Sequence, residues 1–202
     1  MKYGLDTKKL AGIGIFSALS FVLYLVKFPL PVLFPFWLEF KFADIPALIG
    51  SFAYGPVSGI AIIVLRTLLK LLVQGTSTVF VGELGDLLLG IAFVVPSSLV
   101  YAFLKNKYKA LIGILTGSVC YVVTAIIINR FLLVPYYVEL FFGGDFSAIV
   151  NATKSVFKNV NEQNFYKYYL WTAVLPFNLI IAVIDGALTL VVNKFIGKYL
   201  KS

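Results

Sequence analysis

The chain has 202 residues, of which 60% are hydrophobic and 13% are charged, and its mean hydropathy is +0.96. A soluble domain carries charge on about a quarter of its residues, so these few charges could not cover a water-exposed surface, and the chain is expected in a lipid bilayer. It has no histidine and a single cysteine, which excludes a disulfide framework and nearly all zinc or haem sites. The net charge of +8 does not indicate nucleic-acid binding, because the basic residues lie between apolar segments, a pattern that reports membrane orientation.

Apolar segments follow one another along the whole chain. They cover about 9–26, 44–54, 56–74, 82–104, 109–133 and 168–197. A membrane-crossing helix takes about 20 apolar residues, so the second segment is too short to cross unless it is tilted or extended by its flanks. Because little chain is left for an aqueous domain, residues 1–202 are predicted to form one integral-membrane domain.

Lysines between the apolar segments predict the orientation of the chain. They form clusters at the start (Lys2, Lys8, Lys9), between the fourth and fifth segments (Lys105, Lys107, Lys109) and at the end (Lys194, Lys198, Lys201). All three clusters share one side of the membrane only if the number of crossings is even, and basic residues favour the cytoplasmic side. The pattern therefore predicts an all-α membrane protein with six transmembrane helices and both termini cytoplasmic.

Charged residues inside the third and fourth segments need an explanation. Arg66 and Lys70 stand at i and i+4, and Glu83 and Asp86 at i and i+3, so each pair shares one helix face. An unpaired Arg near mid-depth costs about 2.5–3.5 kcal/mol, so Arg66 should have a partner, for which Asp86 or Glu83 is the natural candidate; direct contact of Arg66 with a ligand is the alternative. Glu83 is explained equally well by the helix dipole and by a binding site.

Two amides lie in the outer halves of the last segments, Asn129 in the fifth and Asn178 in the sixth. An amide offers a donor and an acceptor together, which suits a neutral heterocycle, although such residues also bond between membrane helices. With Glu83, Asp44 and the aromatic connection KFPLPVLFPFWLEFKFADIP, they predict a cup open to the outside under an aromatic lid. That connection could also be an interfacial aromatic belt.

The sequence lacks the motifs of an ATPase or a hydrolase. GxxxxGK[ST], GxSxG and HExxH do not occur, so the chain is not expected to bind ATP through a P-loop or to be an enzyme. The first segment carries a strip of small residues, Ala11, Gly14 and Ala18. Such a strip permits close approach of another helix, either within the chain or from another subunit.

The stretches KFADIPALIGSFAYGPVSGI, GTSTVFVGELGDLLLGIAFVVPSSLVYAF and PFNLI resemble the riboflavin-specific S components of energy-coupling factor (ECF) transporters. The likeness covers most of the chain and is weakest at 140–167. It implies a multi-pass protein of the prokaryotic plasma membrane that captures riboflavin from outside, as a transported ligand and not as a cofactor. It also implies docking of the Ala11–Gly14–Ala18 strip on a transmembrane scaffold subunit that carries two ATP-binding subunits.

The same resemblance implies that Glu83, Asn129 and Asn178 bind the vitamin, with the first outer loop closing over it. The full predicted riboflavin-binding set consists of these three residues together with Asp44, Phe40, Phe42, Leu38, Thr78 and Gly82. Possible secondary contacts or ion pairs are Arg66, Lys70, Asp86 and Lys41.

Two positions depart from the family pattern. Ile181 stands where members often carry a lysine, and Lys41 stands where an acidic residue often precedes the Phe42 position. A changed contact set leaves room for FMN, whose phosphate could lie beside Arg66, Lys70 or Lys41, or for another vitamin. A membrane enzyme, a stand-alone channel and a purely structural membrane subunit are the rival functions for a chain of this composition.

Overall fold

The structure is a computed structural model that describes residues 7–200, with the side chains of residues 7–195. Lys2, Lys201 and the side chain of Lys198 lie outside the described part. The elements in chain order are α1 (Thr7–Leu25), β1 (Lys27–Pro29), β2 (Glu39–Lys41), α2 (Asp44–Tyr54), α3 (Pro56–Gln74), α4 (Val81–Phe103), α5 (Lys109–Ile128), η1 (Asn129–Leu133), α6 (Val134–Phe142), α7 (Phe146–Lys154), α8 (Phe165–Tyr168), η2 (Tyr169–Val174) and α9 (Leu175–Leu200).

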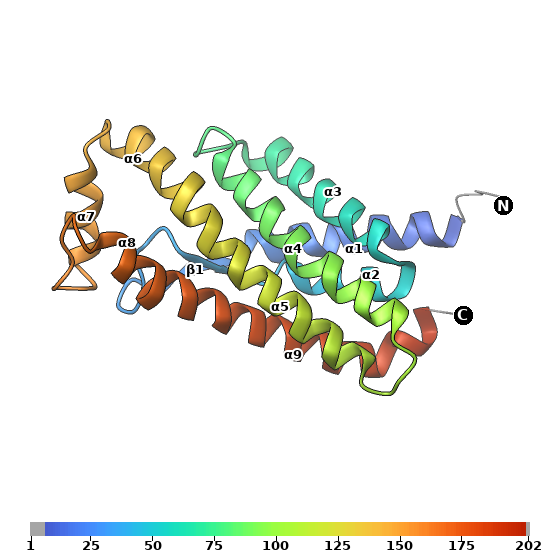
Figure 1. Cartoon of the computed structure of the whole chain (residues 1–202). Helices are drawn as coiled ribbons and strands as arrows, with labels where there is room; N and C mark the ends of the chain where they lie inside the picture. The colour runs from blue at the N-terminus through green and yellow to red at the C-terminus, as the bar shows by residue number, and fades with distance from the viewer. Residues whose placement is uncertain (1–6, 201–202) are drawn as a thin grey trace.

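The long helices form one bundle with two distinct ends (Figure 1). The start of α1, the α2–α3 turn, the α4–α5 turn and the end of α9 lie together at one end, here called the terminal end. The α3–α4 loop, α6, α7 and α8 lie toward the opposite end. In the terminal half, the rings of Phe52 and Tyr101 stack with centroids 4.2 Å apart and an interplanar angle of 9°.

Within the described residues, five helices are long and apolar enough to cross a membrane. Two of them are composite: Lys109–Phe142 joins α5, η1 and α6, and Phe165–Phe195 joins α8, η2 and most of α9. The chain is thus a helical membrane protein. The short segment 44–54 is the 11-residue α2, which at about 1.5 Å per residue covers only about half of the hydrocarbon core. The sixth crossing and the cytoplasmic termini stay predictions.

The two π-helical segments inside the composite helices each end just before a proline. Pro135 and Pro176 follow η1 and η2 closely, and a proline removes an N–H from the helix ladder and clashes with the carbonyl four residues earlier. The chain responds with wider turns: Val134 donates its N–H to the Asn129 carbonyl and Leu175 to the Leu170 carbonyl. Such π-segments are frequent at functional sites.

A short antiparallel hairpin, absent from the all-α prediction, occupies the connection after α1. Lys27 pairs with Lys41, Phe28 with Phe40, and Pro29 with Glu39. The second long connection is also more ordered than a loop, because it contains α7 and α8. Asp145 caps α7 by accepting hydrogen bonds from the N–H and hydroxyl of Ser147 (2.8 and 2.7 Å), which lower the pKa of its carboxyl.

Candidate ligand-binding site

A cavity of about 510 Å³ lies between the hairpin and helices α1, α3, α4, α5–α6 and α9. This volume is within the range of about 300–1,000 Å³ that holds small ligands. Most of the residues predicted for binding or ion pairing line it: Leu38, Lys41, Asp44, Arg66, Lys70, Thr78, Gly82, Glu83, Asp86, Asn129 and Asn178. Ile181, one of the two departures from the family pattern, lines it as well.

Phe40 and Phe42 do not line the cavity, contrary to the prediction. The Phe40 ring is buried against Phe177 of α9, with centroids 4.5 Å apart, and stacks on Phe28 at 5.7 Å. Phe42 also packs against Phe28, at 6.1 Å. Alternation along the strand explains the error, because successive side chains point to opposite faces. These rings hold the hairpin in place rather than face the cavity.

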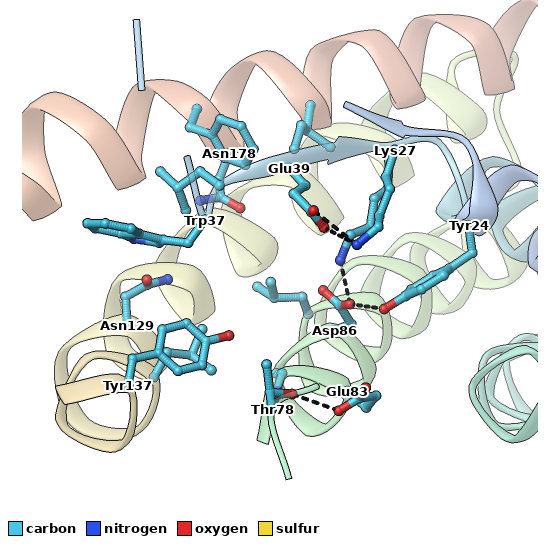
Figure 2. Close-up of a pocket in the computed structure, with 18 of the residues that line it drawn as sticks. Tyr24, Lys27, Trp37, Glu39, Thr78, Glu83, Asp86, Asn129, Tyr137 and Asn178 are labelled. Atoms are coloured by element: carbon cyan, nitrogen blue, oxygen red, sulfur yellow. Dashed lines mark hydrogen bonds and ion pairs between the residues drawn. The ribbon is translucent and has the colours of Figure 1, made fainter. Parts of the chain in front are cut away.

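One side of the cavity is built from amide and aromatic groups (Figure 2). This amide side consists of Trp37, Asn129, Tyr137 and Asn178. Trp37 Nε1–H donates to the Tyr169 hydroxyl at 3.0 Å, and that hydroxyl donates to Asn129 Oδ1 at 3.0 Å. Since Asn129 and Tyr169 are the first residues of η1 and η2, this relay joins both π-segments to the hairpin loop.

Asn178 differs from Asn129 because part of its amide remains available. Its Nδ2 donates to the Val174 carbonyl at 2.8 Å, while its Oδ1 accepts no hydrogen bond from the described residues. The residue is 3% exposed and borders the cavity. A buried acceptor without a partner costs about 1–3 kcal/mol, so Asn178 Oδ1 is suited to a donor on a ligand.

The other side of the cavity is ionic and is centred on α4 (Figure 2). Glu83 forms an ion pair with Lys70 and accepts hydrogen bonds from the hydroxyls of Thr76 (3.0 Å) and Thr78 (2.9 Å). The Thr76 and Thr78 hydroxyls in turn accept the N–H groups of Phe80 (2.9 Å) and Gly82 (3.0 Å). Glu83 therefore organises the α3–α4 loop, where Phe80 takes a left-handed backbone with φ 70°.

Asp86 meets the hairpin and the first helix. Lys41 Nζ lies 2.7 Å from Asp86 Oδ2, and the Tyr24 hydroxyl donates to the same carboxylate. Lys41 also lies over the Tyr24 ring, 4.8 Å from its centroid. Farther along the hairpin, Lys27 pairs with Glu39 at 3.0 Å. Lys41, the second departure from the family pattern, thus ties β2 to α4.

Arg66 has a partner, as expected, but the predicted partner was wrong. Its Nη1 lies 2.6 Å from Asp44 Oδ1 at the start of α2, and both side chains are nearly buried, at 3% and 12% exposure. Glu83 and Asp86 are instead taken by Lys70 and Lys41. Hydropathy predicts the depth of each residue in the membrane, but it does not predict which neighbouring helix the side chain faces. Arg66 faces α2, which provides the nearer carboxylate.

The charges on the cavity wall balance. The lining cations are Lys27, Lys41, Arg66 and Lys70, and the lining anions are Glu39, Asp44, Glu83 and Asp86. Each cation is paired with one of these anions. The wall is therefore formally neutral, and a charged ligand would have to break an existing pair.

Several lining residues were absent from the predicted set. They include Tyr24, Tyr121, Tyr137, Phe177 and, behind the wall, Tyr169, whereas Trp37 belongs to the aromatic connection that was predicted as a lid. Tyrosine in an apolar segment carries a hydroxyl that needs a partner when buried. That signal, together with the prolines at 135 and 176, could have indicated Tyr137 and Tyr169.

The small-residue strip of α1 lies on the outside of the bundle. Ala11, Gly14 and Ala18 are exposed, and a Cβ added at Gly14 would meet nothing within 4 Å. Ser17 and Ser20 of the same helix are buried, and the Ser20 hydroxyl donates to the Ala43 carbonyl at 2.5 Å. The strip is thus not used for packing within the chain.

A sequence model of the family described as "ECF transporter, substrate-specific component" matches residues 8–193. The chain belongs to this family of S components. It is therefore a transporter subunit rather than an enzyme, and a multi-pass protein of the cell membrane.

Named relatives of this S component are similar over most of its length. It is 31% identical over 134 residues to the riboflavin transporter FmnP of Bacillus subtilis (strain 168), an alignment that covers 66% of this chain and 70% of the relative. It is 29% identical over 199 residues to the riboflavin transporter RibU of Staphylococcus aureus (strain TCH60), covering 97% and 94%. A solved structure described as the S component of a bacterial ECF transporter superposes with a TM-score of 0.71 at 25% identity, covering 96% and 98%.

Proposed function

We propose that this S component captures riboflavin from outside the cell for ATP-driven uptake powered by a scaffold subunit and two ATP-binding subunits. The observation that carries the proposal is the two-sided, charge-balanced cavity, with amides and rings on one side and paired charges with hydroxyls on the other. Riboflavin has the same division, because its flat ring system ends in a polar edge and bears a hydroxylated chain. The relatives named riboflavin transporters support the same ligand.

The ring system fits the amide side. Its polar edge offers an N–H donor between two carbonyl acceptors, and the open Oδ1 of Asn178 accepts from that N–H. Asn129, held by Ala125 and Tyr169, lies beside the same edge. Trp37 and Leu38 of the hairpin loop provide apolar contact with the ring. The hydroxylated chain then extends toward Thr78, Gly82 and the Glu83 cluster.

Charge balance favours riboflavin over FMN. A phosphate carries nearly two negative charges at neutral pH, whereas each cation on the wall already has a carboxylate partner. Separating a buried pair such as Arg66–Asp44 or Lys70–Glu83 costs about 3–5 kcal/mol, so a phosphate that took either of these cations would enter at a penalty. Lys41, which departs from the family pattern, adds no free charge because Asp86 matches it.

The orientation follows from the lysines and the bundle. If the terminal end faces the cytoplasm, the basic residues of the α4–α5 turn lie inside, as the positive-inside rule requires, and the cavity opens outward. The hairpin with α2 then makes the sixth crossing. The exposed strip of Ala11, Gly14 and Ala18 is free for the scaffold subunit.

Ligand titrations of the purified full chain in detergent test the proposal. The fluorescence of riboflavin should be quenched when the vitamin binds. Riboflavin should bind at least tenfold more tightly than FMN, and an unrelated vitamin should not bind. A double variant, Asn129→Ala with Asn178→Ala, should lose most of the affinity. Tighter binding of FMN would favour the phosphorylated ligand, and binding of neither flavin would overturn the proposal. In liposomes, uptake by this chain without partners would point to a stand-alone channel.

A further inference from the structure

A second hollow, lined by different residues from the binding cavity, lies on the membrane-facing side of the bundle. It is a groove of about 460 Å³ between α5 and α9 that runs from Leu111 to Val123 on one helix and from Leu179 to Leu190 on the other. Among the described residues that line it, Ser118 alone has a polar side-chain atom. Gly186 lies at the bottom of the groove, where α9 packs so closely on α5 that a Cβ would come within 2.5 Å of Ile114. The groove therefore results from the way α5 and α9 pack against each other.

The length of the groove matches one leaflet of a bilayer. At about 1.5 Å per residue, the stretch from Leu111 to Val123 spans about 18 Å, close to the roughly 15 Å of hydrocarbon in one leaflet. Leu111 and Leu190 mark the end of the groove nearest the terminal end of the bundle (Figure 1). An acyl chain in the groove would therefore place its headgroup at the α4–α5 turn.

Positive charge is concentrated at that mouth. On α9 the lining residues recur every three or four positions, and one more turn beyond Leu190 on the same face brings Lys194. Lys107 lies in the α4–α5 turn, four residues before Leu111. It lies over the Tyr108 ring at 5.0 Å, whereas Lys109 lies over the Tyr101 ring at 4.5 Å, toward α4 and away from the groove. Neither Lys107 nor Lys194 forms an ion pair with a carboxylate of the described residues.

The start of α5 adds to this positive end. No side chain caps it at Tyr108. The N–H groups of Lys109 and Ile112 donate to the carbonyls of Asn106 and Tyr108, which leaves those of Ala110 and Leu111 as the open donors of the first turn among the described residues. Such groups and the helix dipole favour a phosphate. In contrast to the cavity wall, where each cation is matched, this mouth has lysines and no neighbouring acid: the stretches 104–111 and 186–195 contain no Asp or Glu.

We infer that the α5–α9 groove is a binding site for one anionic phospholipid of the leaflet on the terminal side, with an acyl chain along the groove and the phosphate at Lys107 and Lys194. The lipid would fill a hollow that the chain itself leaves open and would fix the depth of α5 and α9 in the membrane. The inference requires only a membrane protein and does not depend on the identity of the transported ligand.

Native mass spectrometry of the purified full chain, with phosphatidylglycerol or phosphatidylcholine of identical acyl chains added, tests this site. The wild type should retain one phosphatidylglycerol with an affinity about tenfold higher than for phosphatidylcholine, since each lysine near a headgroup contributes about 1 kcal/mol. The double variant Lys107→Gln with Lys194→Gln should lose that preference. Lys158→Gln, the same change at an exposed lysine of the other end, should keep it.

A second variant tests the groove rather than the charge. Ala187 lines the groove and is exposed, so Ala187→Phe should fill it and lower retention of both lipids, whereas Ala102→Phe, at an exposed alanine of α4, should not. Flavin binding or the thermal unfolding midpoint of each variant shows whether it is folded. Equal binding of the two lipids, a preference that survives the double lysine variant, or a dimer mass in place of a lipid adduct would each overturn the inference.

Discussion

Replacing Asn178 by leucine is the sharpest test of the binding geometry. Leucine has the same number and branching of side-chain heavy atoms, so the buried side chain is replaced without a cavity, but the open Oδ1 acceptor disappears. A ligand N–H that faced this oxygen would then be buried without a partner. That costs about 1–3 kcal/mol, so the dissociation constant for riboflavin should rise about 5- to 150-fold.

The fold should tolerate this change. The only hydrogen bond that Asn178 forms with the described residues is the intrahelical bond from Nδ2 to the Val174 carbonyl, and hydrogen bonds within membranes average about 0.6 kcal/mol. The matched control is Asn193→Leu, the same substitution on the same helix at a residue that lines neither hollow. Its affinity for riboflavin should equal that of the wild type.

A ligand analogue completes the design. A riboflavin methylated at the ring N–H lacks the donor assigned to Asn178, so it should bind the wild type more weakly than riboflavin does. The Asn178→Leu variant should show a much smaller difference between the two ligands, because the interaction is already lost. Fluorescence titration gives all four dissociation constants. If the variant binds riboflavin within twofold of the wild type, Asn178 is a packing residue and the assignment fails.

Three further substitutions test residues that support the site or the packing of the helices. Tyr169→Phe removes the hydroxyl that holds Trp37 and should speed flavin release about tenfold in stopped-flow measurements; an unchanged rate would mean that the relay does not restrain the hairpin. Asp185→Asn should raise the thermal unfolding midpoint by a few degrees, because both carboxylate oxygens are buried without a hydrogen-bond partner among the described residues; a lower midpoint would reveal a stabilising role for the charge. Gly117→Ala should lower the midpoint by several degrees, since its Cβ would collide with Ser97 and a backbone carbonyl of α4, whereas Gly14→Ala, in open space, should leave it unchanged.

The depth of the polar residues could be predicted from the sequence, and their neighbours could not. Segment lengths and lysine positions placed Glu83, Asn129 and Asn178 at one level, and all three line one cavity. Depth is a one-dimensional quantity that hydropathy supplies directly. To predict which residues form ion pairs, one also needs the rotation of each helix about its axis. Because hydropathy does not give this rotation, Arg66 was assigned to the wrong carboxylate, although Asp44 lies 2.6 Å away.

The irregular backbone was the other missed feature. An apolar run gives the same signal whether it forms a straight helix or one with a π-segment, so the wide turns before Pro135 and Pro176 were not anticipated. They matter because each begins with a residue of the relay, Asn129 or Tyr169. The hairpin was missed for a related reason: strands of three residues are too short to show an alternating pattern.

The charged residues of the oily segments hold the cavity open as well as line it. Lys70–Glu83 joins α3 to α4, Arg66–Asp44 joins α3 to α2, and Lys41–Asp86 joins the hairpin to α4. Apolar side chains alone would pack together and fill such a space. Ion pairs in a membrane are costly to separate, so they fix the walls at a set spacing while they cancel one another's charge. A neutral ligand can then enter a space that is already formed, without displacing any of these pairs.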